Sequence, residues 1–348
     1  MAAKPPRFLS EPLTADAALA RAADAGIHLL RIPTPFAVGR VNTYLIEDDP
    51  LTLVDSGPNS GRALDELQHQ LAERGRSLED IELVVLTHQH IDHLGLVDII
   101  VSHSGAEVAA IDTLAHFAEH YGETAAQDDE FAGGVMRRNG IPDEIVRALQ
   151  TVSSAFRAWG SKAKVTRPLK DGETLQLRDR TLEVLHRPGH SPSDTVFWDK
   201  ERRILIAADH LIKHISSNPL ISRPLDDREP TDPARRPQAL VTYLESLRLT
   251  REMPAEIVLS GHGEPITNHA ALIDERFEFH RRRADKIHEL IAERPRTGYD
   301  LTQALFGDIA VTQAYLTLSE VLGHVDLLLN DGRVTEVEQD GVAWFTAV

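Results

Sequence analysis

Residues 81–93 read IELVVLTHQHIDH, and this stretch decides the fold. Its first six residues form a short apolar run, which predicts a buried strand. Imidazoles two residues apart on an extended segment can point to the same side, so His88 and His90 can share one ion. Asp92 and His93 follow where the chain turns into a helix and can face a second point nearby. Three imidazoles and a carboxylate this close suit two metal ions of borderline hardness.

Three further residues of metal-ligand type stand elsewhere in the chain. His190, Asp209 and His262 each come just after a predicted strand and lie beside turn residues. Side chains at the carboxyl ends of strands are positioned to reach into a cleft at the sheet edge. We therefore expect these three residues to complete the site that residues 88–93 begin.

Composition narrows the class of protein. The chain has 348 residues, a net charge of −17 and no cysteine. The lack of cysteine excludes disulfides, cysteine–zinc ribbons and thiol nucleophiles, and the acidic balance disfavours nucleic acid as a partner. No apolar run is long enough to cross a bilayer, and the first 14 residues lack the apolar core of a secretory signal. We expect a cytoplasmic protein without membrane association.

The order of predicted elements divides the chain into two domains. Residues 1–278 alternate strand and helix patterns around a helical insertion at residues 112–163. Residues 279–348 are typical of a winged-helix-like domain: helix, helix, helix and a hairpin that turns at Asp340-Gly341. The expected recognition helix, Tyr315–Asn330, contains no lysine or arginine. Because groove binding needs cations, we expect this domain to pack or to form a homodimer rather than to bind DNA.

The sequence resembles the metallo-β-lactamase-fold hydrolase superfamily over residues 27–279. The resemblance rests on five motifs in the superfamily's order: Leu53–Gly57, Thr87–Gly95, Pro188–His190, Ala208–His210 and Gly261–Gly263. It implies an α/β fold, an αββα sandwich with a dinuclear metal site along one edge. The C-terminal extension is similar to the winged-helix appendage of the glyoxalase-II-like branch that includes the β-lactamase-like protein 2 group.

The same resemblance implies two divalent metal ions per chain, zinc ahead of iron or manganese. Three histidines would hold one ion, two histidines and a carboxylate would hold the other, and a second carboxylate would bridge them. In that order the ligands are His88, His90 and His190; His93, His262 and Asp92; and Asp209. Asp55 is either a turn cap or a carboxylate that orients a ligand histidine. The superfamily usually has glycine where this chain has Ala208.

The implied activity is hydrolysis of a thioester or ester. Two close metal ions lower the pKa of a water between them, so that a bridging hydroxide forms at neutral pH. Asp92 and Asp209 are the expected catalytic carboxylates. The expected substrate is a small acyl compound: a hydroxyacylglutathione-like or acyl-CoA-like thioester, or a lactone. Two alternatives stay open, a nuclease or phosphodiesterase of the same fold and a mononuclear-iron persulfide dioxygenase.

The helical insertion is expected to cover the cleft. Its apolar side chains predict a wall that suits an acyl chain: Phe117, Tyr121, Phe131, Met136, Phe156 and Trp159. His210 and His214 flank Asp209 and are expected near the pocket. Arg281–Arg283 is read either as a solvated helix face or as an anchor for an anionic substrate tail.

Overall fold

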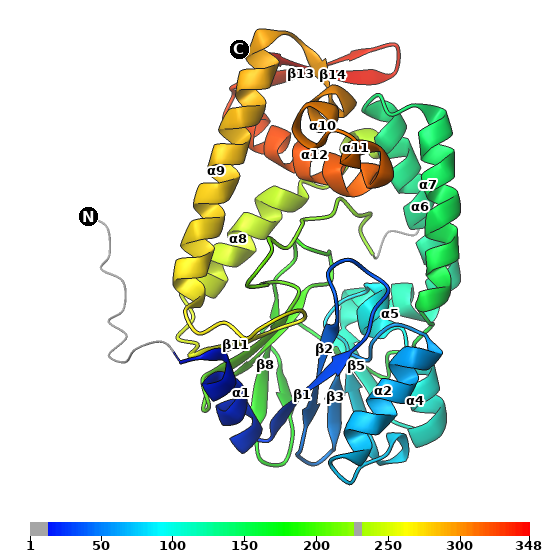
Figure 1. Ribbon diagram of the computed structural model, residues 1–348, viewed down its shortest axis with the longest axis vertical. Helices are drawn as coiled ribbons and strands as arrows, with labels where there is room; N and C mark the ends of the chain where they lie inside the picture. Colours follow the sequence, from blue (N-terminus) through cyan, green and yellow to red (C-terminus); the bar gives the residue numbers. More distant parts are fainter. Residues whose placement is uncertain (1–12, 226–231) are drawn as a thin grey trace, which may run out of the picture.

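Two β-sheets lie face to face between layers of helices, and a third small sheet lies near the C-terminus (Figure 1). This computed structural model describes residues 13–225 and 232–348. The N-terminal segment on which the signal-sequence expectation depends lies almost wholly outside these residues. In the described part of the chain, no helix is both long and apolar enough to span a membrane.

The first sheet is six-stranded and follows the order of the chain. Its strands are β1 (Ile27–Ile32), β2 (Val41–Ile46), β3 (Thr52–Val54), β4 (Leu83–Val85), β5 (Glu107–Ile111) and β6 (Arg167–Leu169). Pairing is antiparallel from β1 to β3 and parallel from β3 to β6. Helices α2 (Gly61–Ala72) and α4 (Val97–Ser104) contribute to the apolar cluster on its outer face. The short helices α1 (Ala15–Asp24) and η1 (Leu78–Asp80) flank the sheet.

The second sheet is five-stranded, in the order β11-β10-β9-β8-β7. Its strands are β7 (Thr174–Gln176), β8 (Thr181–His186), β9 (Thr195–Asp199), β10 (Ile204–Ala208) and β11 (Ile257–Ser260). Only the β10–β11 pair among them is parallel. Helices α8 (Ala239–Arg251) and α9 (His269–Glu293) pack on its outer face, and η3 (Pro233–Arg235) precedes α8.

Apolar side chains from both sheets fill the space between them. Ile46 and Val54 from the first sheet share one buried cluster with Phe197 and Ile206 from the second. Burial of a large aliphatic or aromatic side chain contributes about 1.5–3 kcal/mol, so this shared layer holds the two sheets together. The expected αββα sandwich is confirmed.

The segment after β4 departs from the expected single helix over residues 93–103. It forms two helices, α3 (Ile91–Leu94) and α4, with Gly95 between them. A Cβ on Gly95 would overlap the backbone of Asn59 and Trp159. The chain therefore passes Gly95 in close contact with two other segments, and the helix pattern alone does not reveal this contact.

Residues 112–163 are helical, as expected. They form α5 (Asp112–Glu119), α6 (Tyr121–Arg138), α7 (Asp143–Phe156) and η2 (Arg157–Trp159). The expectation of one apolar wall is corrected, because four of its six side chains are buried in cores: Phe117 and Tyr121 under the first sheet, and Phe131 and Met136 beside the C-terminal helices. Phe156 is exposed and Trp159 is half-buried.

The C-terminal residues form helices and a three-stranded sheet. The elements are β12 (Arg296–Thr297), α10 (Gly298–Phe306), α11 (Ile309–Thr312), α12 (Ala314–Asn330), β13 (Val334–Gln339) and β14 (Val342–Ala347). The hairpin turns at Asp340-Gly341, both with positive φ, as its sequence predicted. The order of elements is the expected one. The winged-helix assignment stays a prediction, as does the boundary at residue 278, which falls inside the continuous helix α9.

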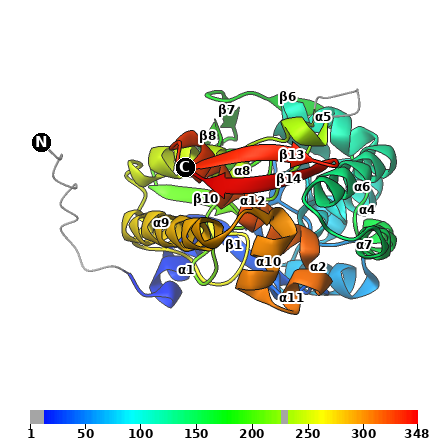
Figure 2. The same cartoon turned by 90° about the horizontal axis from the view of Figure 1, so that it is seen from above.

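The insertion and the C-terminal elements share one apolar core. Phe131 and Val146 of α6 and α7 lie in the same buried cluster as Leu318 and Leu322 of α12. Figure 2 shows the β13–β14 hairpin extending across the top of the molecule toward α6, where Arg138 pairs with Glu336 and Glu338. The two regions are therefore packed together rather than standing as separate appendages.

We predict that Leu322→Ala lowers the free energy of unfolding by about 2–5 kcal/mol, because it opens a cavity in this shared core. Leu316→Ala lies on the same helix, where its side chain is 45% exposed, and should change stability by less than about 0.5 kcal/mol. Urea denaturation of both variants measures the difference. Equal losses would contradict the shared core.

Candidate metal centre

The structure brings all seven predicted ligands to the ends of four strands. The segment 88–93 follows β4, His190 follows β8, Asp209 follows β10 and His262 follows β11. Their potential ligand atoms form three overlapping groups, each within 4.8 Å: His88, His90 and His190; His88, His93 and Asp209; and Asp92, His93 and His262. Each group could hold a metal ion.

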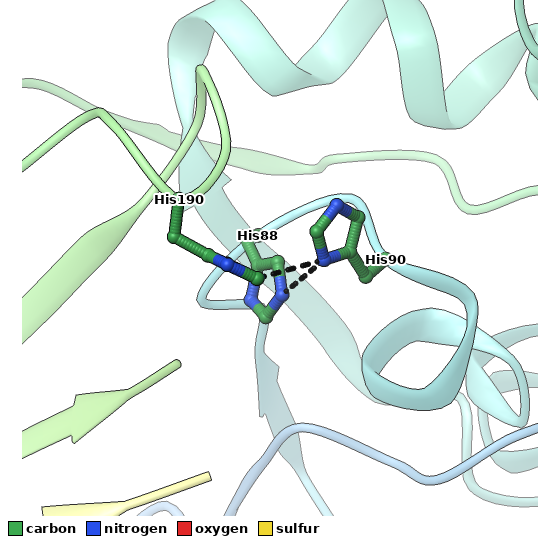
Figure 3. Close-up of side chains that lie close together, drawn as sticks. All are labelled: His88, His90 and His190. Atoms are coloured by element: carbon green, nitrogen blue, oxygen red, sulfur yellow. Dashed lines mark hydrogen bonds between the residues drawn. The ribbon is translucent and has the colours of Figure 1, made fainter. Parts of the chain in front are cut away.

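The three-histidine group has nitrogens at the spacing of metal ligands (Figure 3). His90 Nδ1 lies 3.1 Å from His88 Nε2 and 3.0 Å from His190 Nε2. Nitrogens about 2.0–2.1 Å from a tetrahedral ion lie roughly 3.3 Å from one another. The group therefore needs little adjustment to surround one ion.

Asp209 lies between this group and the next. Its Oδ1 is 3.5 Å from His93 Nε2, and its Oδ2 is 3.6 Å from His190 Nε2 and 3.4 Å from His262 Nε2. Asp92 Oδ2 lies 3.4 Å from the same His262 nitrogen. Asp209 is thus placed to contact ions in both groups, as the expected bridge requires.

Hydrogen bonds on the far side of three histidines fix their tautomers. His93 Nδ1 donates to Asp55 Oδ2 at 2.7 Å, and His190 Nδ1 donates to the Asn218 carbonyl at 3.1 Å. His262 Nδ1 donates to the Arg40 carbonyl at 2.9 Å. Carbonyls and carboxylates only accept, so each Nδ1 carries the proton and each Nε2 has a free lone pair in the neutral ring.

His88 is fixed in the same way through Thr87. The Thr87 hydroxyl donates to Asp55 Oδ2 at 2.8 Å, so its oxygen accepts from His88 Nδ1 at 3.0 Å. The Thr87 backbone N–H donates to Asp55 Oδ1 at 2.9 Å. In their neutral forms, four imidazoles therefore present unprotonated Nε2 atoms to the same small volume.

Two buried atoms at the centre have no hydrogen-bond partner. They are His93 Nε2 and Asp209 Oδ1. An unsatisfied buried polar atom costs about 1–3 kcal/mol, and native structures seldom leave one unexplained. A cation between the imidazole and the carboxylate would satisfy both atoms, so the residues present fit a bound metal.

The charges of the site also favour cations. Asp55, Asp92 and Asp209 are buried, and among the described residues only histidines lie within ion-pair distance of them. Buried carboxylates need positive charge nearby, which histidines supply only when protonated.

The two metal groups differ in their affinity for protons. Burial and, next in importance, the neighbouring His190 together lower the pKa of His90 to about 3, so His90 is neutral near pH 7. Burial also acts against the charged form of His262, but Asp209 and Asp92 outweigh it and raise the pKa of His262 to about 10. Without metal, protons therefore occupy the carboxylate-rich side of the centre.

The other predicted pocket residues differ in their surroundings. The His210 side chain is buried and its Nε2 contacts the Thr250 hydroxyl at 2.8 Å, and His214 is exposed beside Gly263. Arg281 pairs with Glu278 and Asp285, and Arg282 pairs with Glu278, on the surface of α9, which supports a solvated face for these two residues. Arg283 is half-buried and pairs with Glu320.

Sequence reasoning missed Arg40 and Asn218. Both residues accept a hydrogen bond from a candidate ligand histidine through a backbone carbonyl. Every residue has such a carbonyl, so the residue type gives no indication of this role.

Ala208 shows why the superfamily favours glycine before the bridging aspartate. Its φ is 42°, in the left-handed region, where a β-carbon is strained. The pairing of β10 with β11 shifts register between Ile206 and Ala208, which turns Asp209 away from the strand. Across this bulge stands Gly261, where a Cβ would overlap the Asp209 carboxylate.

Residues 37–262 match the family model described as the metallo-beta-lactamase superfamily. The chain belongs to the metallo-β-lactamase superfamily. The match includes all seven of the clustered ligand residues and the strands that carry them.

One relative within the superfamily is similar along most of the chain, and another along about a third of it. A probable metallo-hydrolase, YqjP of Bacillus subtilis, is 34% identical over 91% of this chain and 96% of its own length. The human acyl-coenzyme A thioesterase MBLAC2 is 34% identical over 36% of this chain and 40% of its own.

A solved structure agrees with the fold. The metallo-β-lactamase family protein TTHA1429 of Thermus thermophilus superposes with a TM-score of 0.75, at 26% identity over 93% of this chain and 99% of that chain. Together the comparisons support a metallo-hydrolase, and the narrower glyoxalase-II-like branch stays a prediction.

We predict that Ala208→Gly raises the free energy of unfolding by about 0.5–1 kcal/mol, since glycine relieves the left-handed strain. Metal content should not change, because Asp209 keeps its position. The neighbouring Ala207→Gly is the control: this residue lies in the buried strand, and its replacement should destabilise by about 1 kcal/mol. Urea denaturation measures both, and a loss of stability in both variants would count against strain at residue 208.

Proposed function

We propose that this protein is a hydrolase that cleaves thioesters of apolar acyl groups. It would use two divalent metal ions per chain, with zinc expected ahead of iron or manganese. The observation that carries the proposal is the convergence of four tautomer-fixed imidazoles with the Asp92 and Asp209 carboxylates. Metal ions bound there would supply a Lewis acid for the carbonyl and lower the pKa of a bound water.

The residues around the centre have three roles: holding the metal groups together, orienting ligands and transferring a proton. Asp209 is buried between the two groups and holds them together, and Asp55 orients His93 and, through Thr87, His88. Asp92 is the carboxylate of the ligand set with the most exposed side chain, at 11%. We assign it the task of orienting the attacking water and moving a proton at its Oδ atoms.

An aromatic pair that includes a residue of the segment before Arg40 favours an apolar acyl group. The rings of Phe36 and Phe156 lie 5.8 Å apart, and Phe156 remains 39% exposed. Phe36 is four residues before Arg40, whose carbonyl accepts from His262 Nδ1, so one ring of the pair stands on a segment that contacts the centre.

A thioester is the ester class that this site handles most readily. A thiolate leaving group needs little protonation, so Asp92 can suffice as the proton donor. Similarity to an acyl-coenzyme A thioesterase over 131 residues supports the same class. A phosphodiester is less suited, since the net charge is −17 and the predicted recognition helix α12 is mostly buried.

Steady-state kinetics on a matched substrate panel tests the proposal. The purified protein, loaded with zinc, is given acetyl-, octanoyl- and benzoyl-CoA, a lactone and bis-(p-nitrophenyl) phosphate. We expect the highest kcat/KM with the larger acyl thioesters and its loss in Asp209→Asn. Preferential cleavage of the phosphodiester would contradict the proposal.

We predict that Phe156→Ala lowers the kcat/KM ratio of octanoyl- to acetyl-CoA about tenfold, because a buried apolar contact contributes about 1–3 kcal/mol. Zinc content should equal that of the wild type. Leu249→Ala truncates a 57% exposed side chain on α8 and serves as the control. If Phe156→Ala leaves the octanoyl- to acetyl-CoA ratio of kcat/KM unchanged, the aromatic pair has only a structural role.

A further inference from the structure

The segment that follows Asp209 connects the metal centre to α12. Residues 210–225, here called the Asp209 loop, contain no helix or strand. Figure 1 shows α12 lying over the end of the sandwich that the loops extend from. The loop contacts His190 on one side and α12 on the other.

On one side the loop forms two hydrogen bonds with His190. The Asn218 carbonyl accepts from His190 Nδ1 at 3.1 Å, and the Leu220 N–H donates to the His190 carbonyl at 3.2 Å. The side chain and the main chain of this one histidine therefore both depend on where residues 218–220 lie.

On the other side the loop is tied to α12. Asn218 Nδ2 donates to the Leu316 carbonyl at 3.1 Å. Three residues further on, the Tyr315 hydroxyl donates to the Ile221 carbonyl, and the Ile221 N–H donates to Ser319 Oγ at 3.4 Å. Asn218 therefore forms hydrogen bonds both with His190 and with α12.

Helix α9 holds the earlier part of the same loop. The Arg276 guanidinium donates to the carbonyls of Ile212, Lys213 and Ile215 at 3.0–3.3 Å. These bonds fix the loop before residue 216, and Asn218 lies beyond them, on the part that reaches His190.

The other three fixed histidines do not depend on α12. His88 takes its partner from Thr87 after β4, and His93 takes its partner from Asp55 after β3. His262 takes its partner from Arg40 before β2. All of these partners belong to the sandwich. His190 alone among the four has an acceptor on a segment bound to the C-terminal elements.

We propose that Asn218 is a positioning residue through which α12 sets the orientation of His190 and so completes the three-histidine metal group. The inference rests on the proposed metal centre. It implies that the C-terminal elements tune one metal group and leave the Asp92, His93 and His262 group unaffected. Partners that fix a metal-binding histidine typically change metal affinity 10- to 100-fold when removed.

Zinc titration of the metal-free full-length chain against a chromophoric chelator tests this inference. Asn218→Ala removes the bond to α12, and Asn218→Asp keeps the shape but cannot donate to the Leu316 carbonyl. We expect both variants to weaken one of two zinc equivalents about tenfold and to leave the other unchanged. Cobalt substitution adds a spectrum, in which the band of only one ion should change.

Tyr315→Phe is the matched control, since it removes a hydrogen bond between the same helix and the same loop without touching residue 218. It should lower thermal stability at least as much as Asn218→Ala while both zinc affinities stay within about twofold of wild type. Wild-type affinities in both Asn218 variants, or equal weakening in Tyr315→Phe, overturn the inference. A wild-type chain that binds no zinc overturns the proposed function as well, which separates the two failures.

Discussion

The carboxylate of Asp55 is the contact on which the rest of the metal centre depends. It accepts three hydrogen bonds, from the Thr87 N–H, the Thr87 hydroxyl and His93 Nδ1. Strands β3 and β4 run parallel with Val54 opposite Val85, so Asp55 and Thr87 leave neighbouring strands at the same edge. A φ of 60° at Asp55 turns the chain there, a conformation that aspartate tolerates better than most residues. One buried group thereby aligns two imidazoles.

The sandwich supplies the rigid frame for that alignment, and its loops supply the remaining partners. The apolar layer between the sheets fixes the strand ends, and four of these ends then carry candidate ligands toward the same edge. Function follows from this placement because a preformed ligand set needs little reorganisation when it binds an ion. In the proposed function, the aromatic pair contributes selectivity, and in the further inference α12 positions one ligand; neither supplies the chemistry.

The sequence predicts the ligands because their signal is local: each stands next to a strand, and four lie within six residues. The αββα layers, by contrast, are expected from the resemblance of its five motifs to those of the metallo-β-lactamase superfamily. The sequence does not predict the carbonyls of Arg40 and Asn218, which come from distant segments and carry no residue-type signature. Nor does it separate buried from exposed aromatic residues in the insertion, since helical spacing is the same whether Phe131 packs on α12 or faces a substrate.

The central claim is that this edge of the sandwich binds two metal ions at once. Native mass spectrometry of the chain, first stripped of metal and then re-loaded with zinc at neutral pH, measures it most directly. The account predicts a single species with two zinc ions per chain and the loss of one or both in Asp209→Ala. A fully loaded chain that holds one ion, or none, would contradict it.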